Sequence, residues 1–507
     1  MKNYKGFAVL FASAVSALFV GLDLLRPAAS EAIDCEELLR TFSADTANLV
    51  YRWSPEDMRS EEERRLALFD FMYETYGSST WLPQSLFERN RVTQAVTGNT
   101  DEIVRNTIGM ALWSENRAVK AYGMAPQPDP GKTLGWTVNC LVCHSAEIDG
   151  VVYLGAGSKV FDEKAITDAL MMLTSRTGRL GLSRRSLDYE MAVSTNEIMH
   201  RQHLDVIAPP TRARSTAFAA SHVELGWRAH NGAVPGDEEV GARDIAKIPP
   251  LWHTAAKLPF GRWYLDGSFR GQYALMSTTM ELKKGRSFDE IERYVLPRIK
   301  KQFDDVVQHL RPPRYPHFID RALAAQGKKL FYSAQLGCHT CHGTYDENGN
   351  VEWTGVHVDV GTDRVRLEVV TKRFMDAFQE SPIADHGNLQ KSEGYAAPPL
   401  TGVWANFPYL HNGSVPTLHH LLGSEAERPK IFSVVAARRF DPERVGQQLY
   451  PTQFIHLGKA ELLRKFRDDR NWFNADRAGH GNQGHAVWSR IKTDENRRAL
   501  IEYLKTL

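Results

Sequence analysis

Apolar and polar positions alternate most regularly in three widely spaced stretches of the chain. Residues 61–76 are dense in helix formers, and their apolar positions recur at roughly helical spacing. A second helix is predicted over about 319–333. The pattern is strongest over 493–507, where Thr493 can cap the first turn and the acidic residues after it suit the positive end of a helix. We therefore predict helices in all three stretches.

Elsewhere the pattern is weaker and is interrupted by proline. Prolines cluster over 126–130 and again over 312–316, and each cluster marks a break in the chain. The polar stretch 173–248 shows little alternation, so loops with short helices are predicted there. These breaks predict a helical N-terminal extension over 33–125 and a first haem domain over 126–318. A second haem domain is predicted over 319–507, with an insertion at about 428–479.

The N-terminus has the pattern of an export signal. Two lysines precede the uncharged apolar run Phe7–Val20, and Ser30 and Ala32 place small residues where a signal peptidase cleaves. Residues 1–32 are therefore predicted to be a signal peptide, and the protein is expected in the bacterial periplasm or outside the cell. The alternative is an uncleaved N-terminal segment that anchors the protein in a membrane.

Composition narrows the function classes. The 507 residues carry 62 Lys and Arg against 61 Asp and Glu, a formal net charge of +1. A nucleic-acid-binding protein would show a basic excess, so nucleic acid is not an expected partner. The five cysteines are too few for a disulfide scaffold. Cys35 has no evident partner, whereas the other four form two Cys-x-x-Cys pairs, each followed directly by histidine.

These two motifs match the pattern of covalent haem attachment. In such a motif the two thiols reach the vinyl groups of one porphyrin, and the adjacent imidazole binds the iron. We therefore predict two covalently bound haem c groups. Paired cysteines can also hold zinc or form a disulfide, but these pairs lie far apart and both carry the histidine. The predicted attachment residues are Cys140, Cys143 and His144 in the first motif and Cys338, Cys341 and His342 in the second.

A faint internal repeat accompanies the motifs. A Pro-Pro-Leu triplet begins at Pro249, downstream of the first motif, and another begins at Pro398, downstream of the second. An aromatic-rich stretch and a Gly-Ser pair follow each triplet. The arrangement predicts two related domains, each built around the same kind of site. The predicted fold is therefore mainly α, with two cytochrome c-like haem domains, long loops and an N-terminal helical extension.

The sixth ligands of the irons decide what such a protein can do. Iron with protein ligands on both sides only passes electrons, whereas iron with one open side can bind peroxide or dioxygen. After His342 the chain has one methionine, Met375, and several histidines, so two histidine ligands are predicted for the second haem. After His144 no histidine occurs before His200. An open sixth position at the first haem is therefore the working hypothesis.

Two further stretches resemble a known family. The segment 397–418, which contains Tyr-Leu-His-Asn-Gly-Ser, and the Asn-Gln-Gly-His sequence at 482–485 are similar to the bacterial di-haem cytochrome c peroxidase superfamily. They are especially similar to its rubber-oxygenase-like (RoxA-like) branch. The resemblance is specific over 319–507 and looser over 130–285.

The resemblance implies roles for particular residues. His144 and His342 would bind the two irons from one side, and His485 would bind the second iron from the other, with His480 as the alternative. Trp252 would lie between the haems; the alternative is an ordinary core aromatic residue. Chemistry would occur at the first haem, and electrons would pass through the second. The peroxidases' removable histidine after the first motif is missing here, which disfavours a standard peroxidase.

Two functions follow from these expectations. The first is a haem-dependent oxidoreductase, peroxidase-like or dioxygenase-like, in which Tyr264 and Phe269 are candidates for groups that steer bond cleavage, with simple packing as the alternative. The second is a pure electron carrier with both haems six-coordinate. In either case the expected partner is a small redox protein that gives or accepts electrons. The sequence leaves open whether a calcium ion is also bound.

Overall fold

The computed structural model of the chain describes residues 49–73, 82–83, 105, 109–110, 124–128, 134–177, 179, 182–201, 211–216, 245–261, 269–271, 287–368, 372–380, 384–385 and 387–507. Only the backbone is described for the short pieces at 82–83, 124–128, 134–138 and 269–271, the last of which contains Phe269. The predicted signal segment 1–32, Cys35, Tyr264 and most of the predicted extension 33–125 lie outside these residues.

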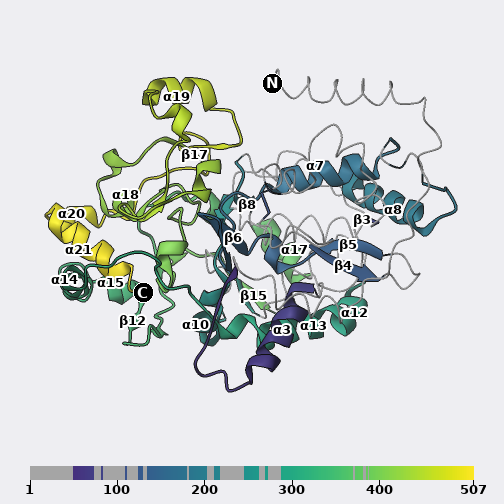
Figure 1. The fold of residues 1–507 in the computed structure, drawn as a ribbon, viewed down its shortest axis with the longest axis horizontal. Helices are drawn as coiled ribbons and strands as arrows, with labels where there is room; N and C mark the ends of the chain where they lie inside the picture. Colours follow the sequence, from purple (N-terminus) through teal and green to yellow (C-terminus); the bar gives the residue numbers. More distant parts are fainter. Residues whose placement is uncertain are drawn as a thin grey trace.

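The helices gather in separate groups (Figure 1). α14, α15, α20 and α21 lie together at one end of the molecule, and α7 and α8 lie at the other. The α-helices in the described residues are α3 (Glu61–Tyr73), α7 (Glu163–Thr174), α8 (Leu187–Arg201), α10 (Thr254–Lys257), α12 (Phe288–Glu290), α13 (Leu296–Asp305), α14 (Arg321–Phe331), α15 (Cys338–His342), α16 (Val365–Glu368), α17 (Lys372–Gln379), α18 (Leu418–Leu422), α19 (Lys459–Phe466), α20 (Trp488–Ile491) and α21 (Asp494–Leu504).

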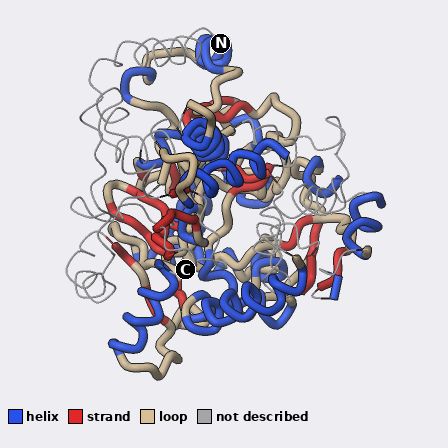
Figure 2. The backbone as a smooth tube through the Cα atoms, turned by 90° about the vertical axis from the view of Figure 1, so that its right-hand side faces the viewer, coloured by secondary structure: helices blue, strands red, loops and turns tan. Residues whose placement is uncertain are grey.

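Short strands run between the helices throughout the molecule (Figure 2) and pair into nine small sheets among the described residues. The sheets β1-β7-β6 and β3-β5-β4 have three strands, and the others have two. The strands are β1 (Leu49–Val50), β2 (Arg52–Trp53), β3 (Leu82–Pro83), β4 (Met124–Pro128), β5 (Leu134–Val138), β6 (Ser145–Ile148), β7 (Val151–Leu154), β8 (Arg214–Thr216), β9 (Ile245–Lys247), β10 (Phe269–Gly271), β11 (Leu310–Arg311), β12 (Thr344–Tyr345), β13 (Val351–Glu352), β14 (His357–Val358), β15 (Gly387–Leu389), β16 (Tyr395–Ala396), β17 (Ile431–Ser433), β18 (Phe440–Asp441), β19 (Gly446–Gln447) and β20 (Trp472–Asn474).

The prediction of a mainly α fold is therefore wrong, because helices are mixed with many small sheets. Long connections must hydrogen-bond the backbone groups that they bury, and paired strands do so where no helix forms. Strands of two to five residues are too short to show an alternating pattern in the sequence. Several also pair with partners far along the chain, as β10 does with β15 and β2 with β11.

The second motif lies beside a tight crossing of α14 and α21. A Cβ atom on Gly327 would come within 1.9 Å of the carbonyl oxygen of Ala499, so glycine is needed for the two helices to approach this closely. Both helices have side-chain caps: Asp320 accepts a hydrogen bond from the first turn of α14, and Thr493 does so for α21. The two helices predicted in this part of the chain are confirmed, with slightly narrower bounds.

The first motif lies at the start of the β6–β7 hairpin. β1, from the predicted N-terminal extension, pairs in parallel with β7 and completes a three-stranded sheet. Asn139, which caps the turn containing Cys140, also donates its amide Nδ2 to the carbonyl oxygen of Met72 at 2.7 Å. That contact joins the motif to α3, the helix predicted over 61–76. α8, with 15 residues, is longer than the short helices predicted in the polar stretch 173–248.

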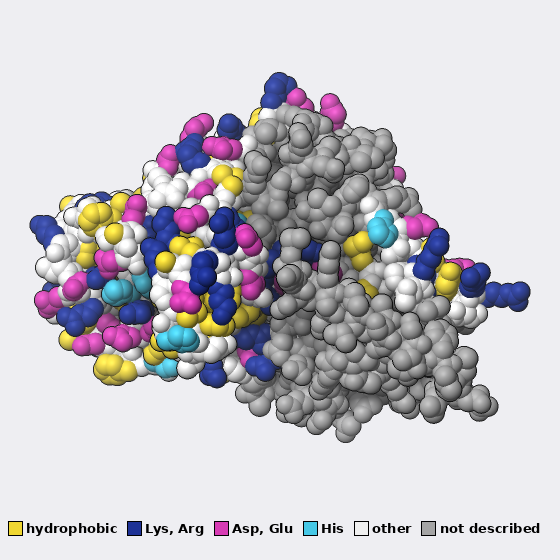
Figure 3. All heavy atoms as spheres, turned by 90° about the horizontal axis from the view of Figure 1, so that it is seen from above, with side chains coloured by type: hydrophobic (Ala, Val, Ile, Leu, Met, Phe, Trp, Pro, Cys, Tyr) yellow, Lys and Arg dark blue, Asp and Glu magenta, His cyan; other side chains and the backbone are white. Residues whose placement is uncertain are grey.

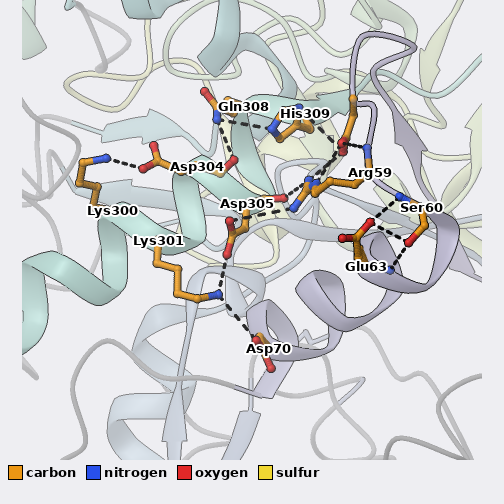
Figure 4. Close-up of polar contacts among 11 residues, drawn as sticks. Arg59, Ser60, Glu63, Asp70, Lys300, Lys301, Asp304, Asp305, Gln308 and His309 are labelled. Carbon is orange, nitrogen blue, oxygen red and sulfur yellow. Dashed lines mark hydrogen bonds and ion pairs between the residues drawn. The ribbon is translucent and has the colours of Figure 1, made fainter.

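Charged side chains connect α3 with the end of α13 (Figure 4). Arg59, just before α3, forms an ion pair of 2.7 Å with the buried carboxylate of Asp57 and donates to the backbone carbonyl of Asp305 at 2.5 Å. Lys301 on α13 lies 3.7 Å from Asp70 on α3. Exposed pairs such as the last contribute roughly 0–1 kcal/mol. The buried carboxylate of Asp57 is therefore the main electrostatic contact of this network.

The stretch predicted to be an insertion, 428–479, folds around its own aromatic side chains. β17 pairs antiparallel with β20, and the rings of Phe432 and Phe473 stack with their centroids 4.9 Å apart. Beside them, Phe466 of α19 stacks on Trp472 at 4.1 Å. The predicted domain boundaries remain predictions. Several sheets cross them; for example, β1 pairs with β7 and β10 pairs with β15.

The surface carries both signs of charge. Basic and acidic side chains are interspersed over the described part of the face shown in Figure 3, in keeping with the near-zero net charge. None of the helices in the described residues combines the length and apolar character that crossing a bilayer requires.

Candidate functional site

A cavity of about 380 Å³ opens beside the second motif. Pockets for small molecules and cofactors commonly measure about 300–1,000 Å³. Aliphatic residues form much of its wall, so the polar and sulfur-bearing groups stand out against an apolar background. These groups belong to Lys247, Cys338, Cys341, His342, Thr362, Tyr395, Asn406, Tyr409, His411, His485 and Arg490.

His342 ends α15 and is held in one orientation. Its Nδ1 atom lies 2.8 Å from the carbonyl oxygen of Pro398. Because a carbonyl oxygen only accepts, the Nδ1 atom must carry the proton, which leaves the Nε2 lone pair for a metal. Burial lowers the pKa of His342, and the Pro398 carbonyl opposes that shift. The ring is therefore a neutral imidazole that is protonated at Nδ1 and has its Nε2 lone pair available for a metal ion.

His485 lies opposite His342. The ring centroids of the two histidines are 6.2 Å apart, with their planes at 68°. A metal–imidazole bond is about 2 Å long, so two rings that bind one ion from opposite sides have centroids about 6 Å apart. Burial, and then the neighbouring His342 and Arg428, lower the pKa of His485 to about 3, so this ring is also neutral at pH 7. The spacing and protonation of the pair suit two axial ligands of one iron.

The loop 479–485 that carries His485 is fastened from several sides. Arg428 donates one guanidinium nitrogen to the carbonyl oxygens of Asn482 at 2.6 Å and Gly484 at 2.8 Å. Gly484 has a φ of +83°, and a Cβ atom there would lie 2.4 Å from the backbone at Gly361. The His485 backbone is itself left-handed, with a φ of +52°. These contacts determine where the ring of His485 lies.

The cysteines suit thioether bonds better than free thiolates. The four described cysteines form no disulfide. Burial raises the pKa of Cys338 to about 11 and also raises the pKa of Cys143, so neither is a thiolate nucleophile at neutral pH. Within the described ranges, no three His, Cys, Asp or Glu side chains gather where they could hold an ion by themselves. Iron in a porphyrin needs only axial ligands from the protein, so the residues present fit a covalently bound haem.

The first motif has similar local geometry. Cys140–Val142 form a single 3₁₀ turn, and the His144 backbone N–H donates to the Cys140 carbonyl at 3.0 Å. Burial lowers the pKa of His144 to about 4, and the Pro249 carbonyl opposes that shift. The contact with Pro249 is nevertheless outside hydrogen-bonding geometry, since His144 Nδ1 has no hydrogen-bond partner. The ring of His144 is therefore neutral but less firmly oriented than that of His342.

The two Pro-Pro-Leu triplets occupy equivalent positions in space. The carbonyl of Pro398 accepts from the histidine of the second motif, and the carbonyl of Pro249 acts on the histidine of the first. The repeat noticed in the sequence therefore brings a proline carbonyl near the histidine of each motif, but only the Pro398 carbonyl accepts a hydrogen bond from it. A shared neighbour of this kind does not require the folds around the two motifs to be the same.

Trp252 lies between the backbone segments of the two motifs. Its indole Nε1 donates to the Thr401 carbonyl at 3.0 Å, three residues after Pro398. On the other side its ring packs against Gly155, whose N–H donates to the His144 carbonyl at 2.9 Å. Trp252 is buried. The indole therefore contacts the backbone near both motifs. An aromatic residue that carries electrons between the sites and an ordinary core residue would both make these contacts.

The other candidate ligands lie elsewhere. Both ring nitrogens of His480 are engaged, Nε2 with Thr211 Oγ1 and Nδ1 with the Ala478 carbonyl, each at 3.0 Å, and this residue does not line the cavity. Met375 lies on α17 and is not a lining residue either.

Several lining groups carried no signal in the sequence. His411 stacks on Tyr395 with ring centroids 3.9 Å apart, and Lys247 reaches the cavity from β9. The repeated Pro-Pro-Leu triplet was the one pattern that could have identified the Pro398 carbonyl in advance. No spacing along the chain connects Lys247 or Arg428 to either motif.

Residues 394–433 match the family described as RoxA-like, cytochrome c-like. This segment includes the wall of the cavity from Tyr395 to His411. The match supports a RoxA-like haem cytochrome and the presence of haem c. A single cytochrome c-like segment is matched, so the prediction of two cytochrome c-like haem domains is wrong: the duplicated motif and triplet do not bring a duplicated fold.

Two curated proteins of Sinorhizobium fredii (strain NBRC 101917 / NGR234) are similar to the chain. Uncharacterized protein y4iJ is 29% identical over 264 residues, which cover 39% of this chain and 41% of that protein. Uncharacterized protein y4iM is 30% identical over 238 residues, covering 39% of this chain and 51% of that protein. The chain thus spans about half the length of these relatives or less. Together with the matched segment, the geometry of the site supports a c-type cytochrome of RoxA-like character.

Proposed function

We propose that this chain is an exported c-type cytochrome that binds haem covalently at both motifs and acts as an oxidoreductase. The observation that carries the proposal is the pair His342 and His485, whose rings face each other at 6.2 Å in a cavity that Cys338 and Cys341 also line. The first motif has the same residues at the same spacing, which supports a second haem.

The residues of the second motif would hold their haem for electron transfer. Once bound, the haem supplies an iron that changes its oxidation state. The Pro398 carbonyl fixes the tautomer of His342, and the loop 479–485 presents His485 from the opposite side. If His342 and His485 both bound the iron, this haem would transfer electrons and would offer no site to peroxide or dioxygen. The largely aliphatic wall of the cavity would pack against the porphyrin once the haem is bound.

The first motif is where we place the binding of peroxide or dioxygen. His144 would bind the iron from one side, and the other side would be open to the small substrate. Trp252, hydrogen-bonded to Thr401 and packed against Gly155, would carry electrons between the two sites. A small redox protein would exchange electrons with the second haem. Export follows from the predicted signal segment 1–32, which also supports a periplasmic or secreted location.

The test begins with the cysteines. Replacing Cys338 and Cys341 with Ala should remove covalent haem from the second motif alone, and replacing Cys140 and Cys143 should remove it from the first. Haem content is measured in denatured, size-separated protein by its absorbance relative to chain concentration. Equal haem content in all three proteins would reject attachment at the motifs.

Carbon monoxide separates the enzyme from a pure electron carrier. Added to the reduced wild-type protein, it should change the absorbance of the first haem only. The variant lacking Cys140 and Cys143 is the control and should not respond. Failure of the wild-type protein to respond would favour the alternative, an electron-transfer cytochrome with both haems six-coordinate.

A further inference from the structure

Three buried cationic side chains lie close together near the cavity. Lys159, Lys247 and Arg214 expose only 3%, 9% and 1% of their surface. Burial lowers the pKa of Lys159, and repulsion from Lys247 and Arg214 lowers it further. Arg214 and Lys247 are paired residues in β8 and β9, and the Nζ atoms of Lys247 and Lys159 contact the adjacent residues Asn406 and Phe407, so the three side chains are neighbours. We name them the buried cation cluster.

The cluster contacts carbonyl oxygens and aromatic rings. Arg214 donates to three backbone carbonyls. Lys247 Nζ donates to the Asn406 carbonyl at 2.7 Å, and Lys159 Nζ lies 4.7 Å from the centroid of the Phe407 ring. Over the described ranges of the chain, none of the three cations forms an ion pair with a carboxylate. Their positive charge is therefore balanced by dipoles and rings alone.

The position of the cluster connects it to both motifs. Lys247 lines the cavity together with Cys338 and His342. Lys159 directly follows Ser158, whose N–H donates to the carbonyl of Cys143 at 2.7 Å. The cluster therefore extends from the cavity of the second motif to the backbone of the first.

Burying these charges without an anion is expensive. Removal of an ion from water costs several kcal/mol even after the protein relaxes, unless a partner of opposite charge compensates. An ammonium group has three donors. Lys247 spends one of them on Asn406, and Lys159 spends none on a hydrogen bond to the protein. The remaining donors suit a carboxylate held in the same enclosed space.

We propose that Lys247 and Lys159 bind propionate carboxylates of haem. Lys247 binds the carboxylates of the haem that is attached at Cys338 and Cys341. This inference rests on the proposed function, because the haem supplies the carboxylates. Arg214, whose donors are largely engaged with carbonyls, adds positive potential behind the two lysines. The cluster is thereby neutralised by the cofactor, and the cofactor is oriented at the edge opposite its thioether bonds.

The experiment uses the full-length haem-loaded protein and measures the reduction potential of its low-spin haem. Lys247→Met removes a positive charge beside the carboxylates, so the potential should fall, because the unbalanced negative charge favours ferric iron. Lys247→Arg keeps the charge and should stay near the wild-type potential. Lys430→Met is the matched control, since the Lys430 side chain is 47% exposed and pairs with Asp476 at the surface; its potential should not move.

A second readout reports the carboxylates directly. The propionate bending band in the resonance Raman spectrum should shift in Lys247→Met and in Lys159→Met, but not in Lys430→Met. An unchanged potential and an unchanged band in Lys247→Met would overturn the proposal. If that variant does not accumulate, a crystal structure of the wild-type holoprotein decides the question. The proposal would be overturned if Lys247 Nζ lay beyond hydrogen-bonding distance of every haem carboxylate.

Two further measurements identify the source of the anion and separate this proposal from the proposed function. Acetate added to the wild-type protein should leave the potential unchanged, because the propionates already occupy the lysines; a potential that rises or falls with acetate concentration would mean a free anion and reject the proposal. Absence of haem absorbance from the wild-type protein would instead reject the proposed function itself.

Discussion

The two Cys-x-x-Cys-His motifs have the same residues but different surroundings. His342 is fixed by a hydrogen bond to Pro398 and faces a second histidine across a cavity. His144 is equally buried, yet its Nδ1 has no hydrogen bond, and its backbone is held through a small sheet and the end of α3. The same local motif therefore has different neighbours in the two places, because the histidine opposite His342 comes from a distant loop and not from the motif.

The regions also differ in how they are held together. The second motif rests against the close crossing of α14 and α21, which depends on shape. Near the first motif, Arg59 joins the segment before α3 to the end of α13: it donates to the Asp305 carbonyl and is itself paired with the buried carboxylate of Asp57. The first contact should be insensitive to pH, whereas the second should weaken in acid.

The largest expected effect comes from removing the opposing histidine. His485→Ala should convert the second haem from low-spin to high-spin, because its iron loses a nitrogen ligand. Electron paramagnetic resonance of the oxidised protein measures the change. His480→Ala is the control: it should keep the low-spin signal while losing a buried hydrogen bond to Thr211, at a cost of about 1–2 kcal/mol. If His480→Ala became high-spin and His485→Ala stayed low-spin, His480 would be the ligand.

A smaller effect is expected at the helix crossing. Gly327→Ala places a methyl group 1.9 Å from the Ala499 oxygen and must push α14 from α21. Overpacking of this kind costs about 1–3 kcal/mol, of which about 1 kcal/mol returns through the better helix propensity of alanine. Denaturant unfolding should therefore show a net loss of up to about 2 kcal/mol. Gly458→Ala has open space around its Cβ position, so it should lose only the roughly 0.5–1 kcal/mol by which glycine exceeds alanine as the N-cap of α19.

Acid should distinguish the contact near the first motif. Hydrogen bonding from Arg59 lowers the pKa of Asp57 from its ordinary 3.8 to about 2. A depressed carboxyl pKa contributes stability above the unfolded value and loses it as the pH falls from about 4 to 2, here about 2 kcal/mol. Asp57→Asn should thus be less stable than wild type at pH 7, and the gap should close below pH 3. A gap that stays constant down to pH 2 would contradict this assignment.

The smallest predicted effect on stability concerns the indole between the motifs. Trp252→Phe removes the hydrogen bond to Thr401, which should cost about 1 kcal/mol, and it should slow electron exchange between the haems. Trp353→Phe is the matched control, because Trp353 is also buried and donates to a carbonyl, that of Ala397, at 2.7 Å. Stopped-flow reduction compares the variants; equal slowing in both would assign Trp252 to simple packing.

Features marked by a residue's own chemistry could be predicted from the sequence. The helix beginning after Thr493 was predicted from its cap and its apolar spacing, and it is present as α21. The RoxA-like resemblance was also visible, and residues 394–433 match that family.

Features that depend on tertiary contact could not be predicted in this way. β10 and β15 pair residues more than one hundred positions apart, and neither strand is long enough to show a period. In the sequence nothing distinguishes Lys247 from a surface lysine, whereas in the structure β9 places it in the wall of the cavity. The repeat around Pro249 and Pro398 led to the wrong inference of two like domains, because a short motif can recur without the fold around it.

The fastening of loop 479–485 has a consequence for assembly. The left-handed pair Gly484 and His485 lies where Arg428 donates to the Gly484 carbonyl and the backbone at Gly361 packs against Gly484. Under the proposed function, a porphyrin would have to enter between His342 and His485 before the two imidazoles could share one iron. The loop that carries His485 would then take its final position after the cysteines had captured the haem.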